Sequence, residues 1–246
     1  AEGETEIMSL VRCAWAGSQK YGVLTWSGDI HSSFRAMREQ LQAGLNMCLA
    51  GIPWWTSDIG GFLGGVITDE KFRELLIRWF QWGCFCPVFR MHGERSPWHE
   101  REQEFINGVR QLTSGQDNEV WSFGEANYEI MKKYLFVREN LREYIREGMR
   151  VASENGTPIM RPVFYDFHED KESWNVEDEY MFGPDLLVAP VMEEGATERE
   201  LYLPAGATWK DANTGKVYEG GQRVTVPAPI DIIPVMIRDG KDIKVY

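Results

Sequence analysis

Short apolar segments alternate with amphipathic helical segments through the first two thirds of this 246-residue chain, and this alternation limits its possible folds most strongly. Four segments are short, rich in aliphatic and aromatic residues and bounded by Gly or Pro, which predicts buried strands at residues 9–15, 22–26, 51–56 and 87–91. Apolar residues recur at helical spacing in three longer segments, which predicts helices at residues 31–49, 69–85 and 127–153. Strands and helices that alternate in this way form parallel sheets with right-handed crossovers. The pattern therefore predicts an α/β fold.

Residues at the ends of these segments support the predicted helix limits. Ser32 and Ser33 lie where the first helix begins, and Thr68 precedes the second, where a hydroxyl oxygen can cap the helix N-terminus. Gly156 followed by Pro158 ends the third helix, because glycine accepts the left-handed conformation that closes a helix and proline cannot continue one. The third helix is predicted to be the longest.

From Thr157 onward the pattern changes to short apolar runs separated by turn signals. Residues 159–164, 186–191 and 223–226 are such runs, and the sequence Asn-Thr-Gly at 213–215 is such a turn. This pattern predicts a small all-β domain, so a domain boundary is expected between residues 156 and 157.

Chemically reactive side chains fall at or just beyond the C-terminal ends of the predicted strands, the edge where barrel enzymes keep their active sites. These side chains are Arg12, Asp29, Asp58 and His92. Three aromatic residues accompany them, namely Trp26, Trp55 and Phe62. Aromatic rings pack on the CH faces of sugars, charged groups make paired hydrogen bonds to hydroxyls, and a carboxyl group can protonate a glycosidic oxygen. The combination predicts a carbohydrate-active enzyme.

Each reactive side chain also has a structural interpretation. Asp29 is placed to cap a helix that starts near residue 31, and Asp58 is placed in a turn. Arg12 could form only an ion pair in the core, and His92 could be a structural histidine. These alternatives stay open at the level of sequence.

The balance of charge and cysteine limits the classes of partner. A net charge of −12 and a pI near 4.9 argue against nucleic acid or an anionic membrane, since binding phosphates needs clustered Lys and Arg. The longest uncharged stretch, residues 42–57, is interrupted by Gly, Asn and Pro, so no membrane span is predicted. We expect a soluble, cytoplasmic protein unless a preceding segment carries an export signal. The cysteines are expected to be buried free thiols without metal-site spacing, and they are Cys13, Cys48, Cys84 and Cys86.

Six sequence blocks follow one another in a recognisable order. They are Arg-x-x-x-x-Gly-Ser-Gln at 12–19, Trp-x-Gly-Asp at 26–29, Ser-Asp-Ile-Gly-Gly-Phe at 57–62, Phe-Arg-Met-His-Gly at 89–93, Gly-Thr-Pro-Ile-Met-Arg-Pro at 156–162 and Leu-Val-Ala-Pro-Val at 187–191. Together they resemble glycoside hydrolase family 31, which contains retaining α-glucosidases and α-xylosidases. The block at 52–62 looks closer to the xylosidase-like branch. The resemblance implies that residues 1–156 form the second half of a (β/α)8 TIM barrel and that residues 157–246 form a sandwich-like β domain.

The resemblance also implies roles for the site residues. Asp29 looks like the family's general acid/base, its acidity weakened among indoles, and Arg12 and His92 look like hydrogen-bonding partners of the sugar. Asp58 looks like a buried acid that orients Arg12 or the sugar ring. No metal or organic cofactor is implied, and an oligosaccharide is the expected substrate.

An aromatic wall of the sugar site is implied as well, made of Trp26, Trp55 and Phe62. Trp54 and Trp55 are adjacent on a predicted strand and face opposite sides of it, so at most one of them lines the pocket.

One family motif is missing from these 246 residues. The family's nucleophile lies in a Trp-x-Asp-Met-Asn-Glu motif before the acid/base block, and no such motif precedes Arg12. The sequence at 174–179 resembles it only superficially and is expected to be a solvated loop. We therefore expect a fragment that is inactive alone and that pairs with the missing N-terminal half or with itself, because an open barrel edge exposes unpaired backbone groups.

Two other classes of function remain possible at this stage. The chain could belong to an α-glucan lyase or transglycosylase of the same family, which would share the acid/base. It could also be a catalytically silent carbohydrate-binding or scaffold protein, which would suit the absent nucleophile. A longer coding sequence that contains the nucleophile motif would favour the enzyme.

Overall fold

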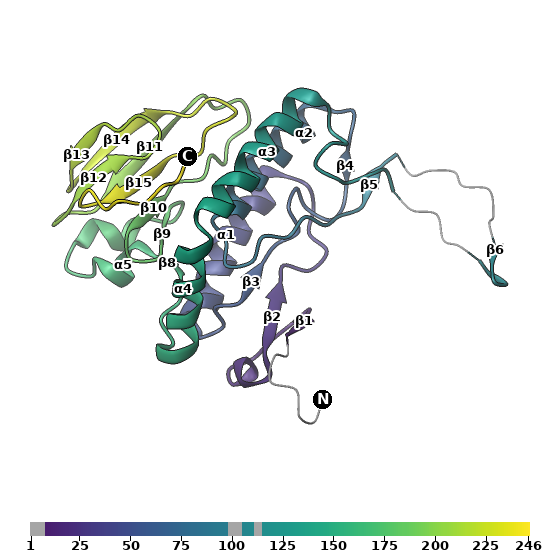
Figure 1. The fold of residues 1–246 in the computed structure, drawn as a ribbon, viewed down its shortest axis with the longest axis horizontal. Coiled ribbons are helices and arrows are strands. Elements are labelled where there is room, and N and C mark those ends of the chain that lie inside the picture. The colour runs from purple at the N-terminus through teal and green to yellow at the C-terminus, as the bar shows by residue number, and fades with distance from the viewer. Residues whose placement is uncertain (1–7, 98–104, 111–114) are drawn as a thin grey trace.

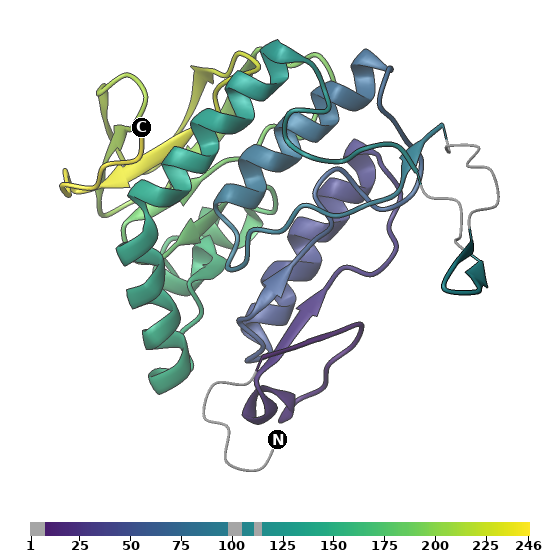
Figure 2. The same cartoon turned by 45° about the vertical axis from the view of Figure 1, so that its right-hand side comes forward.

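The computed structural model describes residues 8–97, 105–110 and 115–246, and it places a helical layer between short parallel strands and a C-terminal β-sandwich (Figure 1). The helices are α1 (Phe34–Leu49), α2 (Glu70–Cys84), α3 (Glu125–Asn140), α4 (Arg142–Asn155) and the one-turn α5 (Val163–Asp166), with 3-10 helices η1 (Ser18–Tyr21) and η2 (Lys171–Asn175). Helices α1, α2 and α3 run in a similar direction across this layer (Figure 2). Helix α1 contacts both the parallel strands and the C-terminal sheet, so it joins the two parts.

The N-terminal part contains a parallel sheet in the order β1-β2-β3. Its strands are β1 (Ser9–Val11), β2 (Val23–Trp26) and β3 (Trp55–Thr56). The prediction of a fourth strand at 87–91 was wrong. That segment runs beside β3, where the Val88 backbone N donates to Trp55 O at 3.3 Å and Thr56 Oγ1 donates to Val88 O at 3.0 Å. Pro87 has no N–H to extend the ladder, so the segment follows β3 without forming a strand.

Two short ladders lie on the connections beyond the parallel sheet. Strands β4 (Gly65–Val66) and β5 (Arg95–Ser96) pair in parallel, and β6 (Phe105–Ile106) and β7 (Val109–Arg110) pair antiparallel. The β4–β5 ladder ties the chain after β3 to the chain after residue 91.

Two of the predicted helix limits need correction. Helix α2 is capped by Asp69, whose Oδ1 accepts from the Lys71 backbone N at 3.0 Å, and Thr68 does not cap it. The single helix predicted at 127–153 is two helices, α3 and α4, separated at the buried Leu141, whose φ of −86° and ψ of 2° depart from helical geometry. The cap of α1 is Ser33, as predicted, with its Oγ accepting from the Ala36 backbone N at 3.1 Å.

The C-terminal part is a β-sandwich, which agrees with the predicted all-β domain. Its six-stranded sheet has the order β13-β12-β15-β10-β9-β8, and a second sheet pairs β11 with β14. The strands are β8 (Met160–Pro162), β9 (Tyr180–Phe182), β10 (Leu186–Val188), β11 (Glu198–Leu203), β12 (Thr208–Asp211), β13 (Val217–Glu219), β14 (Gln222–Pro227) and β15 (Val235–Arg238).

Both faces of the larger sheet are buried. Tyr180 and Phe182 of β9 pack in the core shared with the helices, whereas Met181 between them packs in the core shared with β11 and β14. Leu187 and Met236 face the same side as Met181. Successive side chains of a strand point to opposite faces, so strands buried on both faces must be continuously apolar.

A buried arginine of α2 holds the helical layer to the sandwich. Arg78 is 2% exposed, and its Nη2 donates to the backbone oxygens of Ala196 and Ala228 at 2.9 and 2.8 Å. Its Nη1 donates to the backbone oxygens of Ile232 and Pro229 at 2.9 and 3.1 Å. These carbonyl acceptors replace the water that a guanidinium loses on burial.

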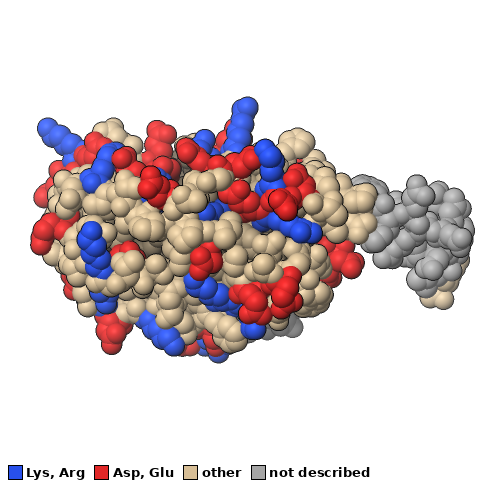
Figure 3. Space-filling view, turned by 90° about the horizontal axis from the view of Figure 1, so that it is seen from above, with Lys and Arg blue, Asp and Glu red and all other residues tan. Residues whose placement is uncertain are grey.

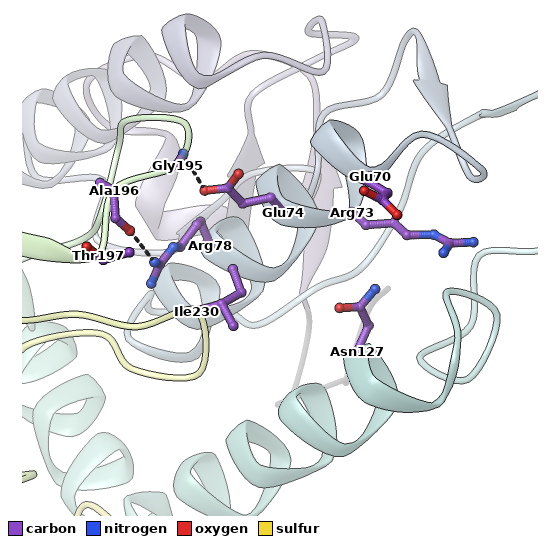
Figure 4. Close-up of a pocket in the computed structure, with 9 residues that line it drawn as sticks. All are labelled: Glu70, Arg73, Glu74, Arg78, Asn127, Gly195, Ala196, Thr197 and Ile230. Atoms are coloured by element: carbon purple, nitrogen blue, oxygen red, sulfur yellow. Dashed lines mark hydrogen bonds between the residues drawn. The ribbon is translucent and has the colours of Figure 1, made fainter.

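The outer part of this junction is an open hollow of about 410 Å³ (Figure 4). At its wall, Glu74 Oε1 accepts from the Gly195 backbone N at 2.7 Å, and Arg78 reaches toward Ala196. None of the seven predicted site residues lines it. It is a feature of the junction between the two parts.

Charged side chains of both signs lie on the face of the molecule that Figure 3 shows from above. Acidic and basic side chains are interspersed over this face. Among the helices of the described residues, none is both long and apolar enough to span a bilayer.

The structure corrects one of the predictions about cysteine. All four cysteines are free, and Cys48, Cys84 and Cys86 are buried. Burial raises the pKa of Cys48 and of Cys84 to about 12, which keeps these thiols protonated and unreactive. Cys13 is exposed, so the prediction that it is buried was wrong. It follows the end of β1, outside the core.

A buried carboxyl group lies inside the sandwich. Glu179 is 1% exposed, its Oε1 accepts from the Tyr202 backbone N at 2.9 Å, and its Oε2 has no hydrogen-bond partner in the described residues. Burial raises the pKa of Glu179 from its ordinary 4.5 to about 8, although the positive charge of Arg199 opposes the shift. Since the folded state holds this proton more tightly, Glu179 contributes stability that is complete below about pH 4.5 and lost as pH rises through about 8.

We predict that Glu179→Gln raises the free energy of unfolding at pH 9 and changes it little at pH 5. The amide oxygen keeps the bond from Tyr202 and no charge has to be buried. Urea unfolding at both pH values measures the effect, with the exposed Glu177→Gln as the matched control. An equal change at both pH values for Glu179→Gln would contradict the burial of an ionisable group.

Candidate active site

Loops that follow the parallel strands meet at one edge of the sheet. Phe62 N and Leu63 N donate to Ile30 O at 2.8 and 2.9 Å, which ties the loop after β3 to the loop after β2. Glu94 N donates to Phe62 O at 2.8 Å, which ties the next loop to the same place. Gly61, in the loop after β3, has a φ of +77°. A Cβ there would lie 2.7 Å from backbone atoms at residues 31 and 32 in the loop after β2. Only glycine fits this approach.

Arg12 and Asp29 form an ion pair across the ends of β1 and β2. Arg12 Nη2 lies 2.9 Å from Asp29 Oδ2, with the side chains 66% and 39% exposed. Asp29 also lines an open hollow of about 450 Å³ beside the start of α1. The helix cap there is Ser33, so the capping interpretation of Asp29 was wrong. Asp29 is also not enclosed by indoles in this structure, because its carboxylate is half exposed and bonded to Arg12.

Asp58 lies beneath this surface with a different partner from the one predicted. Its side chain is inaccessible to solvent, and its Oδ1 accepts from Arg90 Nη1. Arg12 bonds Asp29 and Arg90 bonds Asp58, so the prediction that Asp58 orients Arg12 was wrong, while its alternative, that Asp58 orients the sugar ring, stays a prediction. Asp58 Oδ2 is buried and has no hydrogen-bond partner in the described residues.

The charge state of Asp58 reflects competing effects. Burial raises the pKa of Asp58, while Arg90, and to a smaller extent His92, lowers it. The negative charge of Asp29 raises it slightly further. The net shift of the Asp58 pKa is upward. The site therefore contains two acids in different environments, the exposed Asp29 and the buried Asp58.

An aromatic pair borders the same site. The rings of Phe62 and His92 have centroids 5.5 Å apart and are tilted by 37°. Phe62 is half-buried and His92 is exposed, so the pair presents a ring surface at the edge where the charged groups lie. Trp26, at the end of β2, is also half-buried.

The indole of Trp55 does not belong to this surface. It is 2% exposed, and its ring centroid lies 5.9 Å from that of Trp82 in the hydrophobic core. Trp54 on the opposite side of the strand is 38% exposed. The alternation of side chains was predicted correctly, but Trp55 is the core member of the pair, so its assignment to the aromatic wall was wrong.

Sequence reasoning missed Arg90 as a site residue. It lies two positions before His92 in the block at 89–93, and residues two apart in an extended segment share a face. Its pairing with Asp58 could not be foreseen, because Asp58 comes from a different loop. The described residues hold no cluster of three or more His, Cys, Asp or Glu side chains arranged for a metal ion.

These features agree with comparisons to known proteins. Residues 1–147 match the model of the glycosyl hydrolases family 31 TIM-barrel domain, and residues 156–243 match that of the family 31 C-terminal domain. The chain belongs to glycosyl hydrolase family 31.

Among solved structures, the chain resembles an α-xylosidase of this family from a soil metagenome, complexed with xylose. The TM-score is 0.95 with 55% identity, over 99% of this chain and 36% of that one. The α-xylosidase of Saccharolobus solfataricus is 36% identical over 95% of this chain and 29% of its own length. Alpha-glucosidase 2 of Bacillus thermoamyloliquefaciens is 33% identical over 95% of this chain and 27% of its own length. The chain thus spans about a third of the length of these relatives.

We predict that Arg90→Met destabilises the fold and that the loss grows between pH 5 and pH 8. Breaking a buried ion pair costs about 3–5 kcal/mol, and the partial exposure of Arg90 places the expected loss near the lower end. Without Arg90 the pKa of Asp58 in the folded state rises further. The buried carboxyl group is then neutral at low pH and must ionise without a partner as the pH increases, so the free energy of unfolding falls as the pH rises through that higher pKa.

Urea unfolding of Arg90→Met at both pH values tests this prediction. Arg12→Met, which breaks an exposed pair, should cost less than about 1 kcal/mol. Adding Asp58→Asn to Arg90→Met should remove the extra pH dependence. A loss in Arg90→Met that is the same at both pH values would show that Asp58 does not depend on this partner.

Proposed function

We propose that this chain forms part of a retaining α-glycosidase that releases terminal α-linked xylose or glucose, with Asp29 as general acid and base. The observation that carries the proposal is the position of Asp29 in a family 31 barrel segment. It follows the C-terminal end of β2, is half exposed, and is held by Arg12 from the neighbouring strand. An acid in that place can reach a substrate from one side while its position is fixed from the other.

The proposed chemistry has two steps. First, the protonated Asp29 gives its proton to the glycosidic oxygen as the bond from that oxygen to the anomeric carbon breaks and a second carboxylate attacks that carbon. Then the Asp29 carboxylate takes a proton from a water that attacks the anomeric carbon, the bond from that carbon to the second carboxylate breaks, and the sugar, the protonated Asp29 and the free second carboxylate are released. The proposal assigns the second carboxylate to a segment outside these 246 residues.

The other residues have proposed roles in binding. Within the described residues, Arg12 makes one side-chain hydrogen bond, to Asp29, which leaves guanidinium N–H groups for sugar hydroxyls. Phe62 and His92 would pack on or bond to the sugar ring, and Trp26 would extend this wall. Asp58, whose side chain is inaccessible to solvent, would act on the sugar through Arg90, the partly exposed guanidinium that it holds.

We further propose α-linked xylose as the preferred terminal sugar. The support is similarity: the 55% identical structure is an α-xylosidase with bound xylose, and a curated α-xylosidase is 36% identical. The test uses a longer protein, one that contains these 246 residues together with the segment that supplies the second carboxylate. Its hydrolysis of p-nitrophenyl α-xyloside and α-glucoside tests the choice of sugar. Faster cleavage of the α-glucoside would overturn the choice of sugar, and a transfer or elimination product instead of free sugar would overturn hydrolysis.

We predict that Asp29→Asn in the longer protein nearly abolishes cleavage of natural disaccharides but spares the first step on glycosyl fluorides. Removing a general acid costs about 10²- to 10⁴-fold where the leaving group needs a proton, and fluoride leaves without one. Steady-state and burst kinetics on both substrates measure the difference. Asp69→Asn is the matched control, because Asn also caps α2. Equal losses on the two substrates would remove Asp29 from the acid role.

The 246 residues alone are expected to show no turnover, since the proposal places the second carboxylate outside them. Release of p-nitrophenol from the α-xyloside, measured for these residues and for the longer protein at equal concentration, checks this. Turnover by a monomer of the 246 residues would mean that the second carboxylate lies within them.

A further inference from the structure

Arg95, the first residue of β5, is a fully buried arginine beneath the candidate site. It is 0% exposed, and no carboxylate in the described residues forms an ion pair with it. Desolvation lowers the pKa of Arg95 to about 10, which leaves the guanidinium charged at neutral pH. Asp58 interacts with this charge only at longer range, so neutral acceptors make the direct hydrogen bonds within the described residues and show what Arg95 holds in place.

Its donors reach three separate segments. Nη2 donates to Ile59 O at 2.9 Å and Nη1 to Gly61 O at 2.8 Å, both in the loop after β3. Nε donates to Asn118 Oδ1 at 2.7 Å. The same two terminal nitrogens make longer contacts to His92 O at 3.5 Å and Glu94 O at 3.4 Å in the next loop. One guanidinium is therefore shared between the loop that leads to Phe62 and the loop that carries His92.

The space around this guanidinium is closed. Its central carbon lies 5.0 Å from the centroid of the Phe72 ring, which covers one face. Gly93 has a φ of +152°, and a Cβ there would lie 2.6 Å from both Arg95 Nη1 and Gly61 O. The two loops approach each other as closely as glycine permits, with the guanidinium between them.

We propose that Arg95 is a positioning residue for the candidate active site, because it fixes the loops of Phe62 and His92 relative to each other. Phe62 directly follows Gly61 and His92 directly precedes Gly93, so the paired rings adjoin the two glycines that lie against the guanidinium. Glu94 N donates to Phe62 O and links the two loops a second time. Lysine cannot replace the arginine, since one ammonium cannot reach acceptors that diverge from a planar fork. The part of the proposal that concerns sugar affinity rests on the proposed function, and the part that concerns His92 does not.

A second buried arginine provides a matched control. Arg78 likewise binds backbone carbonyls and is 2% exposed, but it joins α2 to the sandwich at the hollow of Figure 4. A variant of Arg78 therefore reports the general effect of losing a buried guanidinium, without touching either site loop.

The experiment compares Arg95→Lys and Arg78→Lys in the longer protein that also contains the second carboxylate, by NMR of the histidine ring protons and by binding of xylose. The His92 signal is assigned by its loss in His92→Gln. We expect Arg95→Lys to shift or broaden the His92 signal, to leave His168 in the C-terminal part unchanged, and to weaken xylose binding at least tenfold. Arg78→Lys should lower the unfolding midpoint while the His92 signal and xylose affinity stay as in the unchanged protein.

Asn118→Ala keeps the proposal testable if Arg95→Lys fails to fold, since it removes only the acceptor of Nε. It should shift the His92 signal in the same direction by a smaller amount. An unchanged His92 signal in both Arg95→Lys and Asn118→Ala, or an equal shift in Arg78→Lys, would overturn the clamp. If the unchanged protein binds no xylose but His92 responds as expected, the clamp stands and the choice of xylose in the proposed function fails.

Discussion

The rest of the structure depends on the burial of both faces of the six-stranded sheet. One face packs on the helices that follow the parallel strands, and the other packs on β11 and β14. Each large apolar side chain buried there, such as Phe182 or Trp209, contributes about 1.5–3 kcal/mol relative to exposure. Because the same sheet serves both cores, the helical layer that carries the site loops has a fixed support on the side away from the candidate site.

Buried charged groups give this apolar framework its specific arrangement. Arg78 binds carbonyls of the sandwich, Arg95 binds carbonyls of two site loops, and Arg138 donates to Cys84 O and Cys86 O at the C-terminal end of α2. Apolar packing tolerates small displacements, whereas a buried guanidinium that loses an acceptor is left unsatisfied. These arginines therefore fix distances between segments that are far apart in the sequence.

The candidate site shows how far reasoning from sequence reaches. Arg12, Asp29 and Asp58 follow β1, β2 and β3, and parallel strands bring their C-terminal ends together at one edge. His92 follows no strand, and its loop is tied to the same edge by the bond from Glu94 N to Phe62 O. The pairing of those residues was not predictable. Asp58 bonds Arg90 and not Arg12, and that choice depends on how deeply each loop is buried, which no local pattern records.

The sequence by itself determined the alternation of strand and helix, the change to β structure after residue 156, and the family blocks, because these depend on periodicity and on residues close together in the chain. Only the tertiary structure decided that Trp55 is a core residue, that the long third helix breaks at Leu141, and that Arg95 lies beneath the site. The physical reason is that burial and the partners of a buried charge are set by segments from elsewhere in the chain. A side chain's chemistry can be read locally, but what it contacts is fixed only when the whole fold has formed.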